Sequence, residues 1–126
     1  MTETIKVFIV DHVLIVRQML ANIISSEDGF EVVGQEGAIP EAVAALDGIG
    51  PDVILLDASV SGEAALPDAI AQLKNARPNV KIILVTDATT LARVIPSETM
   101  GIVDFISKPF KKDTVLRTIR EAMIAR

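Results

Sequence analysis

Residues 52–57 read Asp-Val-Ile-Leu-Leu-Asp, a run of four aliphatic side chains between two carboxylates. The dipeptide Gly50-Pro51 introduces the run and polar residues follow it, so we expect a short strand from Val53 to Leu56. A strand that is apolar on both faces is typical of a parallel sheet covered on both sides. This stretch therefore predicts an α/β fold with Asp57 at the end of a buried strand.

Apolar runs of the same kind recur along the chain and alternate with segments of helical spacing. The predicted strands are Ile5–Val10, Phe30–Val33 (ended by Gly34), Val53–Leu56, Val80–Val85 and Ile102–Ile106. The predicted helices cover Ile15 to Ile24, Pro40 to about Leu46, about Ala64 to Ala76, a short or broken helix within Thr89 to Met100 that Pro96 interrupts, and Lys111 to Ala125. Right-handed crossovers place helices on both faces of such a sheet, so we expect one doubly wound domain, residues 1–126, with about five helices.

Composition narrows the class of protein. Half of the 126 residues are hydrophobic, enough for a core of its own, and the absence of cysteine excludes disulfides and thiolate metal sites. The net charge of −5 argues against a nucleic-acid surface, which needs a basic stripe. No apolar stretch approaches the ~20 residues that span a bilayer. We expect a cytoplasmic protein that contacts neither nucleic acid nor membrane.

Polar side chains stand at the ends of the predicted strands. They are Asp11 and His12 after the first strand, Asp57 after the third, Thr86 after the fourth and Lys108 after the fifth. In a doubly wound parallel sheet, functional groups gather at the carboxyl ends of the strands. A single aspartate at such a place is often only a solvated cap, but joint placement of all five predicts a site.

Four segments together resemble the response-regulator receivers of two-component signalling. They are Val10-Asp11, Asp52–Asp57, Val85-Thr86 and the run Asp104–Phe110 with its Lys-Pro-Phe signature. The likeness extends over nearly the whole chain, and the combination of these segments at these distances is specific. It implies a flavodoxin-like, five-stranded parallel sheet of order 2-1-3-4-5.

The resemblance also implies a role for each residue. Asp57 would be the phosphoacceptor, a carboxylate nucleophile, and Lys108 would pair with the added phosphoryl charge. Thr86 would donate its hydroxyl to a phosphoryl oxygen, and Phe105 would fill the space that Thr86 leaves. For Phe105, plain core packing is an equal alternative. Pro109 is the candidate for a cis peptide bond that aims Lys108.

The same resemblance implies a Mg²⁺ site made by Asp11, Asp57 and the backbone carbonyl of Ser59. Receivers usually carry two adjacent acids after the first strand, and here the second is His12. Imidazole is a poor ligand for Mg²⁺, so we expect His12 to weaken magnesium binding. Three interpretations stay open: simple loss of magnesium affinity, an imidazolium that replaces part of the metal's charge, or a ligand for a softer divalent metal.

Other positions depart from the receiver pattern. Ser61 stands where proline is usual, Ala65 where glycine is frequent, and Asp87 where a small uncharged residue is common. Asp87 would add negative charge beside the approach of an anionic phosphoryl group. Pro96 disturbs a helix that usually belongs to the output face, so an unusual signalling surface is expected.

Two functions compete from the sequence. The first is a stand-alone receiver in a phosphorelay that accepts phosphate on Asp57 from a histidine kinase or phosphotransfer protein and then binds a target protein. Val13, Ile15 and Val16 would form its kinase-docking surface, and the face of the fourth helix, fifth strand and fifth helix could support a homodimer. The second is a degenerate receiver that binds partners without phosphorylation, which His12 and Asp87 favour.

Enzymatic alternatives fit less well. A haloacid dehalogenase-type phosphatase needs a second aspartate two residues after its nucleophile, and Ser59 occupies that position. A flavodoxin needs a hydroxyl-rich phosphate loop and aromatic side chains to stack on flavin, but the chain has neither Trp nor Tyr. We therefore expect a phosphoacceptor signalling domain and not an enzyme.

Overall fold

A computed structural model of the protein describes residues 4–60, 65–87 and 101–124. Five parallel strands form one sheet in the order β2-β1-β3-β4-β5, as predicted. The strands are β1 (Ile5–Val10), β2 (Phe30–Glu36), β3 (Val53–Asp57), β4 (Lys81–Thr86) and β5 (Ile102–Ser107). Every residue of β3 is buried, which agrees with its position at the centre of the sheet.

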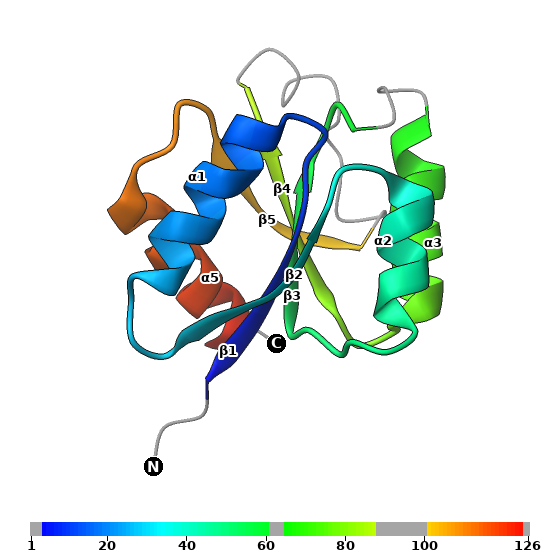
Figure 1. Ribbon diagram of the computed structural model, residues 1–126, viewed down its shortest axis with the longest axis horizontal. Helices are drawn as coiled ribbons and strands as arrows, with labels where there is room; N and C mark the ends of the chain where they lie inside the picture. The colour runs from blue at the N-terminus through cyan, green and yellow to red at the C-terminus, as the bar shows by residue number, and fades with distance from the viewer. Residues whose placement is uncertain (1–3, 61–64, 88–100, 125–126) are drawn as a thin grey trace.

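Helices cover both faces of the sheet. The described helices are α1 (Leu14–Ser25), α2 (Ile39–Leu46), α3 (Leu66–Ala76) and α5 (Lys112–Ile124). Helices α1 and α5 lie on one side, and α2 and α3 lie on the other (Figure 1). The helix expected between Thr89 and Met100, with its Pro96, lies outside the described residues, as does Ser61. None of the helices described is long and apolar enough to cross a bilayer.

The sheet separates two hydrophobic clusters. Because strand side chains alternate between faces, Phe8, Ile54 and Leu84 pack with α2 and α3, whereas Ile9 and Leu55 pack with α1 and α5. The inner strands β1, β3 and β4 are therefore mostly apolar because both of their faces are buried, whereas the edge strands β2 and β5 are partly exposed.

The predicted end of the second strand was wrong. Strand β2 continues through Gly34 to Glu36 and stays paired with β1, with a register shift between Val7 and Phe8 that brings Gly34 opposite Phe8. A Cβ on residue 34 would lie 2.5 Å from Cε1 of Phe8. The glycine therefore makes room for the Phe8 ring inside the strand and does not terminate it.

Candidate functional site

The Asp57 carboxylate is the centre of the site. It ends β3 and is 2% exposed. Its Oδ1 lies 3.1 Å from Nζ of Lys108, and its Oδ2 accepts a hydrogen bond of 2.8 Å from the Ser59 hydroxyl. Nδ1 of His12 also lies 3.1 Å from Oδ2. A buried carboxylate is thus surrounded by donors from three different segments of the chain.

Lys108 reaches Asp57 from the loop that follows β5. Its backbone N–H donates to the carbonyl oxygen of Thr86 at 2.7 Å, which ties this loop to the end of β4. The peptide bond between Lys108 and Pro109 is cis. The ammonium group is partly open to solvent, so it can meet an incoming anion while it stays paired with Asp57.

Asp11 is the second buried carboxylate at this edge and is 1% exposed. Its Oδ1 accepts a hydrogen bond of 2.9 Å from the backbone N–H of Val13, but its Oδ2 has no hydrogen-bond partner among the described residues. Burial raises the pKa of Asp11, and the negative charge of Asp57 raises it further. The hydrogen bond from the Val13 N–H and the charges of Lys108 and His12 lower this pKa, but the net shift is upward. The Oδ2 of Asp11 is a buried acceptor without a donor among the described residues.

Thr86 ends β4 at this edge, and Phe105 lies within the neighbouring strand β5. The buried Thr86 hydroxyl donates to the carbonyl oxygen of Asp87 at 3.4 Å. The half-buried Phe105 packs against the hydrophobic cluster under α2 and α3. The structure therefore brings Asp11, His12, Asp57, Ser59 and Lys108 together.

Two contributions were missed by the sequence analysis. The Ser59 side chain binds Asp57, although only the Ser59 backbone carbonyl was expected to take part. Arg17 of α1 donates from Nη1 to the carbonyl oxygen of Asp11 and so fixes the start of the loop after β1. Ser59 is only two residues from Asp57 in the sequence, and this proximity could have indicated the contact between their side chains.

Comparison with known proteins decides the family. Residues 7–120 match the response regulator receiver domain. The chain belongs to this receiver family. It is 34% identical to the chemotaxis protein CheY of Listeria monocytogenes over 94% of this chain and 98% of the relative, and 33% identical to CheY of Thermotoga maritima over 92% and 95%. The solved response regulator domain of Thermotoga maritima CheB superposes with a TM-score of 0.81 at 28% identity, covering 98% of this chain and 99% of that one.

Receiver domains act in two-component signalling, where they interact with histidine kinases and downstream targets, and they typically bind Mg²⁺ at an acidic pocket. In this receiver the pocket groups Asp11, His12 and Asp57, with one ligand atom of each within 4.8 Å of the others. The unpartnered Oδ2 of Asp11 and the Asp57 carboxylate suit a hard cation, but imidazole does not. The complete set of three donors does not fit Mg²⁺.

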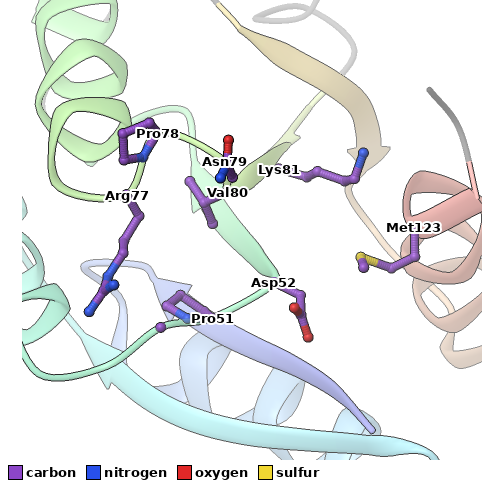
Figure 2. A pocket seen from close by; sticks show the side chains of 9 residues that line it. Pro51, Asp52, Arg77, Pro78, Asn79, Val80, Lys81 and Met123 are labelled. Carbon is purple, nitrogen blue, oxygen red and sulfur yellow. The ribbon is translucent and has the colours of Figure 1, made fainter. Parts of the chain in front are cut away.

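A second hollow of the receiver, about 310 Å³, lies at the opposite edge of the sheet (Figure 2). It is lined by Gly50, Pro51, Asp52, Arg77, Pro78, Asn79, Val80, Lys81 and Met123. Asp52 accepts a hydrogen bond from the backbone of Lys6, and Nε of Arg77 donates to the carbonyl oxygen of Leu46. The first contact connects the amino ends of β1 and β3, and the second connects the end of α3 to the end of α2, so we assign the hollow a structural role.

Proposed function

We propose that this receiver accepts a phosphoryl group on Asp57 and transmits the signal by changing its contacts with other proteins. The observation that carries the proposal is the pair of Asp57 Oδ1 and Lys108 Nζ, 3.1 Å apart, at the carboxyl edge of the sheet. A buried carboxylate beside a partly exposed cation combines a nucleophile with a binding group for an anion.

The reaction follows from these contacts. A carboxylate oxygen of Asp57 attacks the phosphorus of a phosphohistidine or small phosphodonor, the new O–P bond forms, and the bond from phosphorus to the leaving group breaks. Lys108 binds the phosphoryl oxygens as negative charge accumulates. The Ser59 hydroxyl, now 2.8 Å from Oδ2, is close enough to move its donor to a phosphoryl oxygen.

Propagation of the signal involves Thr86 and Phe105. The Thr86 hydroxyl has a long hydrogen bond of 3.4 Å to Asp87, so a phosphoryl oxygen on Asp57 offers it a stronger acceptor. Rotation of Thr86 toward the phosphoryl group vacates space beside β5, where Phe105 is only half-buried. Phe105 then repacks and alters the surface of β5 and α5.

The surface beside the site suits a protein donor. Val13, just before α1, and Leu14, Ile15 and Met19 of α1 are exposed apolar residues, with exposed fractions of 38%, 56%, 66% and 49%. Val16, which the sequence also predicted for this surface, is only partly exposed and packs against the hydrophobic cluster under α1 and α5. The Val13 backbone is hydrogen-bonded to Asp11, so this apolar patch adjoins the pocket. We assign the α1 patch to docking of a histidine kinase or phosphotransfer protein.

The remaining parts of the proposal rest on the relatives. The chain aligns with 98% of the Listeria monocytogenes chemotaxis protein CheY, which supports action as a stand-alone receiver in the cytoplasm with a separate target protein. A homodimer would use the β5 and α5 face.

One observation favours a second function. His12 already lies 3.1 Å from Asp57 Oδ2, the oxygen that also holds Ser59. If these contacts persist, the carboxylate is satisfied without phosphate, and the domain acts as a degenerate receiver that binds partners independently of phosphorylation.

Amide NMR spectra before and after addition of beryllofluoride, a phosphoryl mimic, test the proposal. The wild-type protein should show shifts at Asp57, Thr86, Phe105 and Lys108, with Mg²⁺, Co²⁺ or Zn²⁺ supplied in separate samples. Asp57→Asn should show none, because the amide cannot form the adduct. Equal shifts in that variant would refute the assignment of Asp57, and an unchanged wild-type spectrum with every ion would favour the degenerate receiver.

A further inference from the structure

The Asp11 carboxylate provides the starting point. It is 1% exposed, and its Oδ2 has no hydrogen-bond partner in the described part of the chain. A buried charged oxygen without a donor is costly unless a cation or hydrogen bond compensates it. One ligand atom of Asp11 is grouped with those of His12 and Asp57, so a cation bound there would compensate both buried carboxylates at once.

We infer that Asp11, His12 and Asp57 bind a divalent transition-metal ion of the Fe²⁺ to Zn²⁺ series in preference to Mg²⁺, with Nδ1 of His12 as the third ligand. The inference uses the pocket of the proposed function and names the metal that this pocket selects.

The spacing of the donors supports a shared ion. Nδ1 of His12 and Oδ2 of Asp57 are 3.1 Å apart. Two ligand atoms that each lie ~2.1 Å from one ion are about 3.0 Å apart at right angles and about 3.4 Å apart at the tetrahedral angle, and the observed separation falls in this range. The donor atoms of all three residues lie within 4.8 Å of one another, so small side-chain movements suffice to enclose an ion.

The type of donor decides which ion is preferred. Mg²⁺ takes oxygen ligands and retains water, whereas imidazole suits iron, nickel, copper and zinc. With His12 in place of a third acid, only two carboxylates remain, opposed by the nearby Lys108 ammonium, so electrostatic attraction for a hard cation is small. A transition-metal ion is less affected by this loss of negative charge, because its bond to the imidazole nitrogen adds to its binding free energy.

His12 can be observed without ambiguity, because it is the only histidine of the chain. We would titrate the full chain with Zn²⁺, Co²⁺ and Mg²⁺ in the absence of any phosphodonor. Calorimetry gives the affinities, and the ring ¹⁵N resonances of His12 report ligation at Nδ1. We expect Zn²⁺ and Co²⁺ to bind at least tenfold more tightly than Mg²⁺ and to shift the Nδ1 resonance.

Two variants separate the contributions of the ligands. His12→Asp should lower the Co²⁺ affinity relative to that for Mg²⁺ and strengthen Mg²⁺ binding itself. Asp11→Asn keeps the imidazole but removes a carboxylate, so it should abolish the Zn²⁺-dependent shift of His12. Circular dichroism of both variants verifies that they fold.

Equal affinities for Mg²⁺ and Zn²⁺ in the wild-type protein, or an Nδ1 resonance that Zn²⁺ leaves unchanged, would overturn the inference. The proposed function fails separately. A protein that binds Zn²⁺ through His12 but gives no beryllofluoride response with any of the ions would refute phosphorylation and retain the metal site. A beryllofluoride response in a protein whose His12 binds no metal would support phosphorylation and refute the metal site.

Discussion

At the scale of single residues, Asp11 carries a stability cost that the site requires. Burial and the nearby Asp57 charge raise the pKa of Asp11 above its ordinary value of 3.8. The folded state therefore holds the Asp11 proton more tightly than the unfolded state, and this residue reduces stability as the pH rises from the unfolded pKa through the folded one. The cost is fully present once the pH exceeds the folded pKa.

We predict that Asp11→Asn stabilises the metal-free protein at pH 7 by about 1 to 3 kcal/mol. Asparagine keeps an acceptor for the Val13 N–H and removes the uncompensated charge. Urea unfolding in the presence of a chelator measures the difference. The gain should shrink as the pH falls through the folded pKa of Asp11 and vanish below the unfolded pKa, where the wild-type carboxyl is protonated in both states. A variant that is less stable than wild type at neutral pH would contradict this account.

The residues of the site were largely predictable, but their contacts were not. Strand ends at one edge of a parallel sheet bring Asp11, Asp57 and Lys108 together whatever the details of the loops. Which oxygen of Asp57 faces His12, and that the second oxygen of Asp11 lacks a partner, depend on side-chain rotations that residue order does not specify.

At the scale of secondary-structure elements, the pairing of β1 with β2 depends on Gly34. A Cβ at this position would lie 2.5 Å from Cε1 and 2.8 Å from Cδ1 of the buried Phe8. We predict that Gly34→Ala lowers the free energy of unfolding by about 1 to 3 kcal/mol, because the Phe8 ring must leave its packed position. Urea unfolding measures this loss.

Gly48→Ala is the matched control, because a Cβ there meets nothing within 4 Å. Its effect should stay within about 0.5 kcal/mol of wild type. If both alanine variants lose the same stability, the cause is the general cost of replacing glycine and not the contact with Phe8.

The elements show why some boundaries follow from sequence and others do not. The apolar runs of β1, β3, β4 and β5 mark strands to within one residue of their ends. Burial on both faces explains this for β3 and for most of β1 and β4, whereas β5 is partly exposed and includes Asp104. Gly34 has the same local signature as a turn glycine, and its role becomes apparent only opposite Phe8, which is distant in the sequence. Local composition cannot encode a contact of that range.

At the scale of the whole molecule, the fold places the pocket and the exposed α1 patch at the same edge. Ile15 is 66% exposed, so its replacement should leave the core intact, and an aspartate in the first turn of a helix is favourable. We predict that Ile15→Asp slows phosphotransfer from a phosphohistidine donor protein at least tenfold, because docking buries this side chain. Reaction with acetyl phosphate, which needs no docking surface, should be unchanged.

Ile124→Asp tests whether this effect is local. Ile124 is 77% exposed at the end of α5, next to Met123, which lines the hollow at the opposite edge of the sheet. The substitution introduces the same charge but lies far from Asp57, so phosphotransfer from the donor protein should match wild type. Radiolabelled transfer assays on both variants measure the rates. Equal slowing in both would point to net charge, whereas slowing of the acetyl phosphate reaction by Ile15→Asp would point to damage to the pocket. Only selective loss of protein-donor transfer in Ile15→Asp assigns the α1 patch to docking.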